Sequence, residues 1–187
     1  GFLHVVVNHA HLGAKIEAAV GDGSRWGLRI RYSPETQALE TAGGIAKALP
    51  LLGPDPFYVI NIDSFWIDRD TPALQRLRAA WDDAIMDCIL LLCPLDQTVG
   101  YDGAGDFVLK PDCRVLRKSA ASGKPLAYIG AYLVSPRLFA GAPPGKFSMN
   151  LLWDIAISEG RLHGLVHDGL WLHVGTPEAI GLAEAEL

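Results

Sequence analysis

The sequence predicts an α/β fold, a three-layer, Rossmann-like arrangement in which helices cover both faces of a mostly parallel sheet. Two observations support this prediction. The first third of the chain repeats strand, helix, strand, helix and strand patterns, as proteins with parallel sheets do. Two largely apolar runs, at residues 57–60 and 86–93, are typical of strands that are buried on both faces.

The first half of the chain supplies three strands and two helices. The strand at residues 28–32 alternates apolar and polar side chains, as a strand with one polar face should. A turn containing Gly43 and Gly44 is expected to lead into a helix that Pro50 follows closely. We therefore expect strands at residues 5–7, 28–32 and 57–60, and helices at residues 12–20 and up to residue 49.

The second half continues the sheet and adds a small β-hairpin excursion. Asp70-Thr71-Pro72 is typical of a helix start. The composition changes to Gly, Asp and Lys over residues 100–124, which predicts the hairpin, and the Asp168-Gly169 turn is expected to join two short strands. We expect strands at residues 86–93, 107–109, 114–116, 128–134, 165–167 and 171–174, and helices at residues 70–81, 147–157 and from 176 onward.

Composition narrows the kind of protein. A chain of 187 residues, half of them apolar, can bury one core, so we expect a single domain over residues 1–187. No stretch reaches the roughly 20 apolar residues of a membrane span, and no signal peptide is visible. Three cysteines without a Cys-x-x-Cys pair favour a cytoplasmic protein that has no zinc site. The net charge of -5 includes no basic stripe, which argues against nucleic acid as the main partner, while a small phosphorylated ligand is still allowed because a local Lys or Arg can serve it.

Asp63 is the first candidate for a functional side chain. It follows a buried strand, and the ligands of open α/β sheets bind beyond the carboxyl ends of the strands. A carboxylate placed there can serve as a metal ligand or as a base, but it can equally cap the turn that follows. This stretch alone leaves both interpretations open.

Six segments carry a resemblance to a known family. They are residues 7–13, 21–27 and 39–50, then Asn61-Ile62-Asp63, Gly105-Asp106-Phe107 and residues 171–177. In this order they span nearly the whole chain and resemble the sugar-1-phosphate nucleotidyltransferases. The resemblance is closest to the N-acetylmuramate 1-phosphate uridylyltransferase branch, often labelled mannose-1-phosphate guanylyltransferase, and it implies the nucleotidyltransferase fold.

The chain departs from the family pattern at three points. The family begins with a strand and a Gly-x-Gly-x-Arg loop that holds the nucleoside triphosphate. This chain starts after them, so we expect it to be truncated at the N-terminus, with the first strand missing. The strand motif, usually Asn-Gly-Asp or Asn-Ser-Asp, is Asn61-Ile62-Asp63 here, and His173 stands where the family commonly has Asp.

The resemblance implies an enzyme that transfers a nucleotidyl group from a nucleoside triphosphate to a sugar 1-phosphate. UTP is favoured over GTP, pyrophosphate is released, and the product is a nucleotide sugar for cell-wall or polysaccharide metabolism. Such catalysis depends on positioning and on neutralising phosphate charge, so Mg²⁺ is the expected cofactor. The expected partners are the nucleoside triphosphate and the sugar 1-phosphate, and the oligomeric state is left open.

Asp63 and His173 are the expected catalytic residues, with Asp63 as the metal ligand. Imidazole is a poor ligand for Mg²⁺, so the second ligand of the family can be lost, replaced by water or supplied by a neighbour such as Asp168. His173 can instead hydrogen-bond a phosphate or a sugar hydroxyl, or it can simply pack at a strand end.

Eight further residues are implied to bind the substrates. By resemblance, residues 39–44 border the nucleobase, because bare glycine backbone and a helix N-terminus allow close approach of a base or phosphate. The structural alternatives are a plain helix start for this loop, a turn for Asp106, a sheet bulge for Gly130 and a cap for Asn150. The expected nucleotide-binding residues are Glu40, Thr41, Gly43 and Gly44, and the expected sugar-binding residues are Gly105, Asp106, Gly130 and Asn150.

Two apparent motifs are better explained by structure. Asp68-Arg69-Asp70 spells the Asp-x-Asp of metal-dependent glycosyltransferases, but it lies just ahead of a helix, where acidic residues are favoured. His9 and His11 have no third metal ligand in view. The main alternative function is a non-catalytic module that binds a nucleotide or a sugar phosphate, and a glycosyltransferase is a third hypothesis.

Overall fold

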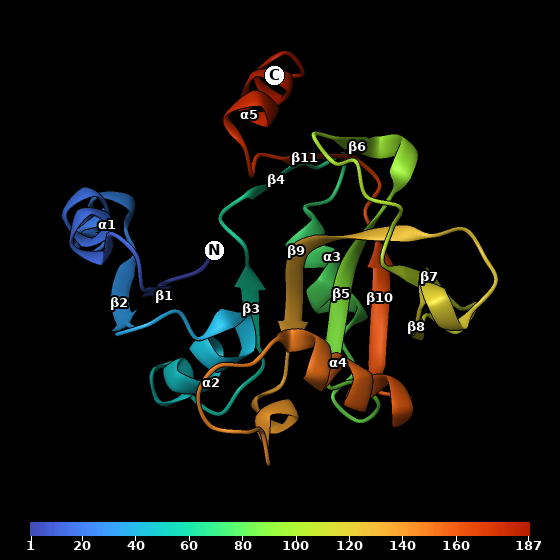
Figure 1. Cartoon of the computed structure of the whole chain (residues 1–187), viewed down its shortest axis with the longest axis horizontal. Coiled ribbons are helices and arrows are strands. Elements are labelled where there is room, and N and C mark those ends of the chain that lie inside the picture. Colours follow the sequence, from blue (N-terminus) through green and yellow to red (C-terminus); the bar gives the residue numbers. More distant parts are fainter. The chain divides into compact units, whose positions relative to one another are not determined.

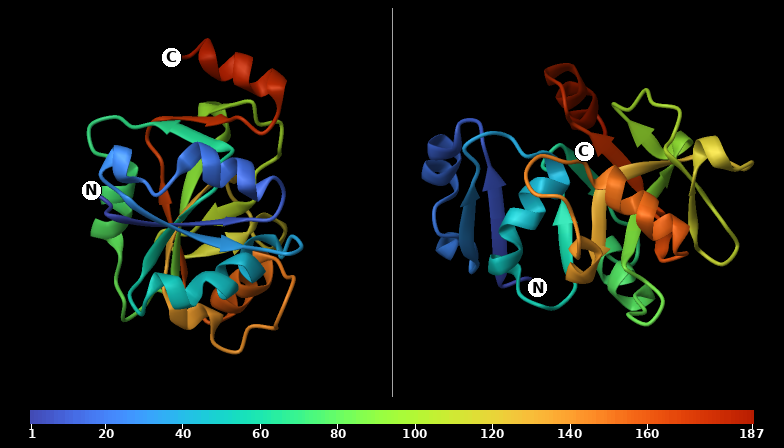
Figure 2. Two further views of the ribbon diagram at one scale, coloured as in Figure 1. Left: turned by 90° about the vertical axis from the view of Figure 1, so that its left-hand side faces the viewer. Right: turned by 60° about the horizontal axis from the view of Figure 1, so that its bottom comes forward.

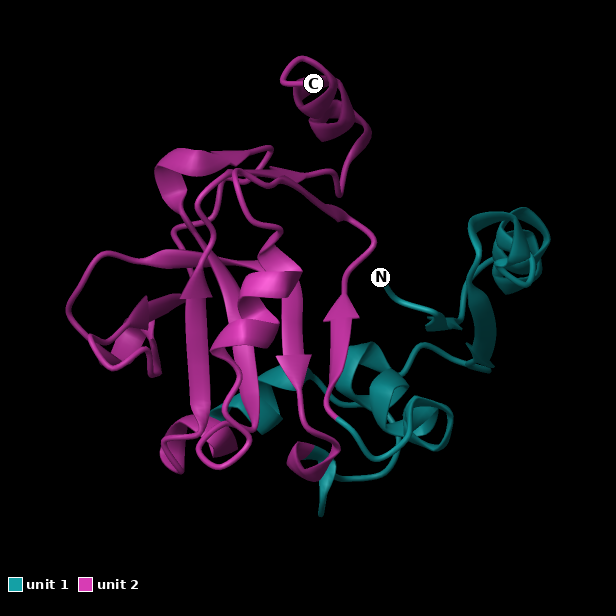
Figure 3. Cartoon of the chain, turned by 180° about the vertical axis from the view of Figure 1, so that it is seen from behind, with its two compact units in different colours: residues 1–55, 139–154 teal, residues 56–138, 155–187 magenta.

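The computed structural model describes all 187 residues (Figure 1). The chain divides into two compact units, shown in different colours in Figure 3. Unit 1 comprises Gly1–Asp55 and Phe139–Asp154, and unit 2 comprises Pro56–Leu138 and Ile155–Leu187. The single domain expected from the sequence stays a prediction. None of the helices combines the length and the apolar character that crossing a bilayer requires.

Unit 1 is built on a two-stranded parallel sheet. Its elements are β1 (His4–His9), α1 (Gly13–Val20), β2 (Arg29–Pro34), α2 (Glu40–Leu52) and the amino-terminal part of α4 (Met149–Ser158). The two strands pair with Val5 opposite Ile30, and Figure 2 shows them side by side. Helix α2 contacts both strands. The strands and helices predicted for this part of the chain are confirmed.

Helix α2 differs from the prediction at both ends. It begins at Glu40, so Gly43 and Gly44 lie inside the helix and not in a turn before it. Glycine weakens a helix by roughly 0.5–1 kcal/mol relative to alanine, which is why the pair suggested a turn, but burial of both residues outweighs that cost. The helix also continues through Pro50 to Leu52, since a proline in the last turn disturbs few helical hydrogen bonds.

Unit 2 contains the larger sheet and most of the buried core. Its strands and helices follow the predicted order, with two additional short strands, β4 and β6. The elements are β3 (Phe57–Ile60), β4 (Ser64–Ile67), α3 (Ala73–Ala80), β5 (Cys88–Pro94), β6 (Thr98–Val99), β7 (Phe107–Leu109), β8 (Val115–Arg117), β9 (Leu126–Val134), β10 (Leu162–Val166), β11 (Leu170–His173) and α5 (Pro177–Glu184), with the end of α4.

The central sheet of unit 2 confirms the α/β class but not the predominance of parallel pairs. Six strands form it in the order β10-β5-β9-β7-β8, with β3 paired to β9. Strand β10 is parallel to β5, whereas β9 runs antiparallel to both β3 and β5. A strand buried on both faces reads as a continuous apolar run in either direction, so the sequence pattern did not reveal that β9 is reversed.

A second, smaller sheet covers one end of unit 2. It has three strands in the order β4-β11-β6, and β4 pairs antiparallel with β11. The buried core cluster of this unit combines side chains from α3, β5, β9 and β11, including Leu77, Ile89, Leu91, Ile129 and Trp171. Residues of β9 and β11 thus contribute both to the core and, as shown below, to a pocket beside it.

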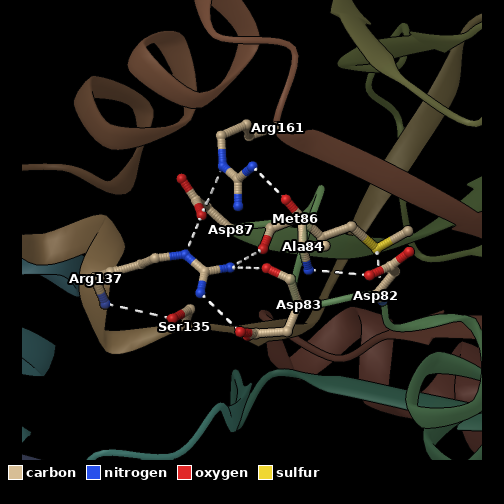
Figure 4. A network of polar contacts seen from close by, with 8 residues as sticks. All are labelled: Asp82, Asp83, Ala84, Met86, Asp87, Ser135, Arg137 and Arg161. Atoms are coloured by element: carbon tan, nitrogen blue, oxygen red, sulfur yellow. Dashed lines mark hydrogen bonds and ion pairs between the residues drawn. The ribbon is translucent and has the colours of Figure 1, made fainter.

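A polar network ties the start of β5 to segments that are distant in sequence (Figure 4). The guanidinium of Arg137 donates to the carboxylate of Asp87, to the carboxylate of Asp83 at 3.0 Å and to main-chain carbonyls of Asp83 and Met86. Arg161 adds a second contact to the Asp87 carboxylate at 2.9 Å. The Asp87 side chain is only 9% exposed, so two cations compensate a nearly buried charge.

Candidate functional site

A pocket in unit 2 gathers four of the residues predicted from the sequence. Its volume is about 190 Å³, smaller than the roughly 300–1,000 Å³ of sites that enclose a whole small-molecule ligand. The turn after β3, the loop after β6, the middle of β9 and the end of β11 supply its walls. The lining residues are Asn61, Asp63, Ser64, Tyr101, Asp106, Tyr128, Ile129, Gly130, Trp171 and His173.

Gly130 allows the turn after β3 to lie against β9. Its φ is +81°, and a Cβ atom at this position would lie 3.0 Å from the Cβ atoms of both Asn61 and Ser64. The main-chain N–H of Asn61 donates to the Gly130 carbonyl at 2.8 Å. The β5–β9 register shifts next to this position, which agrees with the bulge considered for Gly130. The sugar contact predicted for Gly130 stays a prediction.

Asp63 lies in the turn between β3 and β4, where its exposed side chain lines the pocket. Its carbonyl accepts a hydrogen bond from the main-chain N–H of Val174 at 2.9 Å, and the next residue, Ser64, pairs with His173 across the β4–β11 ladder. An ideal Cβ at Gly175 would lie 3.0 Å from Nε2 of His173 and 3.8 Å from Oδ2 of Asp63. The carboxylate and the imidazole therefore both approach Gly175.

Asp106 also lines the pocket. Its Oδ2 accepts the main-chain N–H of Tyr128 at 2.9 Å, and the Tyr101 hydroxyl lies 3.5 Å away. Burial raises the pKa of Tyr101, and the negative charge of Asp106 raises it further, so this phenol stays protonated at neutral pH. The contact to β9 fits the turn interpretation of Asp106, while its place in the pocket keeps the sugar-binding interpretation open. Gly105, with φ +80°, adjoins Pro125 and is not itself a lining residue.

The charge of the pocket indicates which ligands it can accept. It is lined by two carboxylates, those of Asp63 and Asp106, and by no lysine or arginine. A phosphate entering this pocket therefore requires a cation to offset the repulsion between negative charges. No cluster of three or more His, Cys, Asp or Glu side chains that could hold a metal ion is present, so substrate oxygens or water would have to complete the coordination.

The predicted nucleotide-binding residues belong to unit 1. Glu40, the first residue of α2, has a φ of +61° and lies 3.6 Å from the Lys146 ammonium. A Cβ at Gly43 would lie 2.3 Å from the carbonyl oxygen of Gly145, and a Cβ at Gly44 would lie 2.5 Å from a carboxylate oxygen of Glu35. Packing within unit 1 thus explains both glycines. The binding of a nucleotide by Glu40, Thr41, Gly43 and Gly44 stays a prediction.

Several other candidates have structural partners. The exposed Asn150 is the second residue of α4, and its main-chain N–H is bonded to the Ser148 hydroxyl at 3.2 Å, so Ser148 rather than Asn150 caps the helix. Asp168 pairs with Arg76 at 2.7 Å and does not line the pocket, which does not favour it as a replacement metal ligand.

Each of the two discounted motifs has a structural partner, although His9 is the last residue of β1 with a side chain only 7% exposed and not the surface or turn histidine that was expected. The Asp68 carboxylate accepts the main-chain N–H of Ala73, the first residue of α3, at 2.8 Å. This agrees with a helix-start role for the Asp68-Arg69-Asp70 motif. Nε2 of His9 contacts the carboxylate of Glu17 at 2.8 Å.

Six lining residues were not among the predicted site residues, and one of them, Ile129, directly precedes the predicted Gly130. Asn61 and Ser64 flank the predicted turn, and Trp171 precedes His173 by two positions, so their neighbourhood in sequence was a usable signal. Tyr101 and Tyr128 had no comparable signal. The hydroxyl of Tyr101 and the main-chain N–H of Tyr128 both donate hydrogen bonds to the Asp106 carboxylate, and these contacts form only in the folded chain.

Comparison with known proteins finds close relatives along nearly the whole chain. No protein-family model matches it. It is 41% identical over 185 residues to an N-acetylmuramate alpha-1-phosphate uridylyltransferase of Caulobacter vibrioides, a match that covers 97% of this chain and 76% of that protein. The corresponding enzyme of Neisseria meningitidis is 39% identical, with 94% and 74% covered. A mannose-1-phosphate guanylyltransferase of Mycobacterium tuberculosis is 41% identical, but the match covers only 52% of it.

Solved structures show the same fold at lower identity. HddC from Yersinia pseudotuberculosis superposes with a TM-score of 0.77 at 19% identity, covering 100% of this chain and 80% of that one. The inositol-1-phosphate CTP transferase of T. maritima gives a TM-score of 0.74 at 13% identity, with 98% and 74% covered. The fold is therefore shared well beyond the range in which sequence identity is informative.

Proposed function

Since the chain belongs to the sugar-1-phosphate nucleotidyltransferase family, we propose that it transfers a uridylyl group from UTP to a sugar 1-phosphate. The choice of UTP rests on one observation, the identity of 41% and 39% to two uridylyltransferases that match over most of their length. The names of these two relatives point to N-acetylmuramate α-1-phosphate as the sugar substrate of this chain. The product would be a UDP-sugar for cell-wall metabolism, made in the cytoplasm, and the three free cysteines agree with that location.

In this reaction a phosphate oxygen of the sugar 1-phosphate attacks the α-phosphorus of UTP, and pyrophosphate leaves. Catalysis of this kind depends on alignment of the reacting oxygens and on neutralisation of phosphate charge. The pocket supplies alignment through side chains that are themselves held in place. Asp106 is fixed by the main chain of Tyr128, and the Asp63 turn is fixed by Val174 and Gly130.

A divalent cation fits the chemistry of the pocket. The Asp63 carboxylate is a hard oxygen donor of the kind that Mg²⁺ prefers, whereas the His173 imidazole is a weaker donor for this ion. We infer that Asp63 holds Mg²⁺ and that His173 contacts a phosphate or a sugar hydroxyl. The ion would neutralise the phosphate charge that two carboxylates and no basic side chain leave uncompensated in this pocket.

The test is magnesium-dependent release of pyrophosphate from UTP and from GTP, each with a panel of sugar 1-phosphates that includes N-acetylmuramate α-1-phosphate. We expect release with UTP and this sugar, and loss of release in Asp63→Asn. Asp70→Asn is the matched control, because Asp70 does not line the pocket. A preference for GTP would overturn the choice of nucleotide.

The alternative functions have their own expected outcomes. A folded sample that binds nucleotide but releases no pyrophosphate with any pair would favour the non-catalytic binding module. The glycosyltransferase hypothesis requires a second assay, in which sugar is transferred from a nucleotide sugar and a nucleoside diphosphate is released. Loss of that release through Asp70→Asn but not through Asp63→Asn would favour it.

A further inference from the structure

Trp171 lies at the boundary between the core of unit 2 and the pocket. Its side chain is 3% exposed and belongs to the same buried cluster as Ile89 and Ile129. It is also one of the residues that line the pocket. A side chain that is anchored in the core on one side can hold pocket residues in place on the other.

A relay of two hydrogen bonds connects Trp171 to the pocket floor. The indole Nε1–H donates to the Ser64 hydroxyl oxygen at 2.9 Å, and the Ser64 hydroxyl donates in turn to the main-chain carbonyl of Ile129. The hydroxyl of Ser64 therefore accepts one bond and donates another. Through this one side chain, β11, β4 and β9 are linked beneath the pocket.

The indole ring also restricts the aromatic wall of the pocket. Its centroid lies 5.5 Å from that of His173, with the rings inclined by 40°, and 5.1 Å from that of Tyr101, inclined by 49°. Tyr101 meets the His173 ring edge-on at 6.5 Å. These separations are typical of favourable aromatic pairs, and the three rings form one cluster in which the His173 imidazole contacts both larger rings.

Ser64 directly follows Asp63, and it pairs with His173 in the β4–β11 ladder. Fixing the Ser64 side chain therefore limits the movement of the Asp63 turn, and fixing the Trp171 ring limits the movement of His173. We propose that Ser64 and Trp171 are positioning residues that hold Asp63 and His173 in their working arrangement. The proposal rests on the proposed function, because it assigns Asp63 and His173 to the reaction.

Three variants test the proposal: Ser64→Ala, Trp171→Phe and the double variant. Ser64→Ala removes the relay with little change in volume. Trp171→Phe removes the N–H and part of the ring. Ser158→Ala is the matched control for the hydroxyl, because Ser158 also donates to a main-chain carbonyl, that of Ile155 at 2.7 Å, but does not line the pocket. Trp81→Phe is the control for the indole, because Trp81 packs against the same core cluster without lining the pocket.

Three quantities are measured on each variant: kcat for pyrophosphate release, the Kd of Mn²⁺ in the presence of UTP by electron paramagnetic resonance, and the free energy of unfolding. Substituting a residue that orients a metal ligand typically lowers metal affinity or activity by roughly 10–100-fold. We expect the losses in both single variants to fall in this range. The double variant should show about the same loss of kcat and of Mn²⁺ affinity as the more impaired of the two single variants, because both residues act through one relay. The two control variants should keep the wild-type kcat and Kd.

The outcomes separate this proposal from the proposed function. If Ser64→Ala lowers only the free energy of unfolding and keeps the wild-type kcat and Mn²⁺ affinity, the positioning role is overturned while the function stands. If the wild-type chain releases no pyrophosphate with any substrate pair, the proposed function fails, and the Mn²⁺ affinity of Ser64→Ala still decides the positioning role. Ser64→Ala decides the matter even if Trp171→Phe fails to fold.

Discussion

Gly130 and Ser64 approach each other so closely that a Cβ atom on the glycine would lie 3.0 Å from the Cβ of the serine and 3.2 Å from its hydroxyl oxygen. This contact brings the turn that carries Asp63 onto the middle strand of the larger sheet. The absence of a side chain at position 130 is therefore a determinant of where the Asp63 carboxylate lies.

We expect Gly130→Ala to lower kcat for pyrophosphate release by about 10-fold, because the neighbours of the new Cβ must give by a few tenths of an ångström, and a full shift of about 1 Å at a reacting centre can cost about 100-fold. Gly141→Ala is the control. Gly141 also has a positive φ, +76°, but a Cβ there would meet no atom within 4 Å. Gly141→Ala should lower only the free energy of unfolding, by the backbone strain of about 1 kcal/mol, and leave kcat unchanged. Equal kcat values in the two variants would show that crowding at position 130 has no effect on the site.

Removing Arg137 should destabilise unit 2. In Arg137→Met the Asp87 carboxylate, 9% exposed, keeps only Arg161 as a cationic partner. Breaking a buried ion pair in this way costs about 3 kcal/mol of unfolding free energy, measured by urea denaturation. Arg114→Met breaks a surface pair whose partners are 44% and 48% exposed, and it should lower the free energy of unfolding far less, because solvent screens the pair. A similar loss in both variants would contradict the importance assigned to burial.

The stability of the protein should fall as the pH is lowered through the range in which histidine titrates. His167 is fully buried, and burial lowers its pKa, although the charges of Asp68 and Asp168 oppose the shift. The folded state therefore holds a neutral imidazole, while the unfolded chain takes up a proton near pH 6.5. The stabilisation is complete above that pH and is lost as the pH falls towards the lower pKa of the folded state.

This dependence is measured as the free energy of unfolding between pH 7.5 and pH 5, a range chosen to span roughly one unit either side of the unfolded pKa. The wild-type protein should lose more stability than His167→Gln over this range. Burial also lowers the pKa of His163, but this residue is present in both proteins, so its contribution to the pH dependence cancels in the comparison. Parallel curves for the two proteins would rule out His167 as the source.

One cysteine should react with Ellman's reagent in the native protein. Cys113 is exposed, whereas Cys88 and Cys93 are buried, and burial together with the charge of Asp96 raises the pKa of the Cys93 thiol to about 12. Only the thiolate reacts, so Cys93 should stay unmodified until the chain unfolds. Cys113→Ser should abolish the native reaction, and all three thiols should react in denaturant. Rapid modification of the Cys113→Ser variant would mean that the β5 region opens readily.

Local patterns predicted most of the fold but not how its strands pair. Residues 57–60 and 128–134 were recognised as buried strands from their apolar runs, and both are strands in the structure. Their antiparallel pairing depends on neighbours that are distant in sequence, which no local pattern records. Strand β4 was missed because it follows the Asp63 turn at once and is only four residues long.

The site was predicted to a similar extent. Asp63, Asp106, Gly130 and His173 come from four separate segments and meet in one pocket. The contribution of Ser64 depends on a hydrogen bond to Trp171 that spans more than half of the chain. Such a bond follows from strand register, and register becomes known only with the three-dimensional structure.

The pairing of β4 with β11 has a consequence for the order of folding. It joins Ser64 to His173, so the pocket is completed by a contact between segments far apart along the chain. Contacts of this kind carry a large loop-closure entropy and form slowly. During refolding, helical circular dichroism should therefore recover before enzymatic activity, and a nascent chain would acquire a competent site only after β11 has left the ribosome.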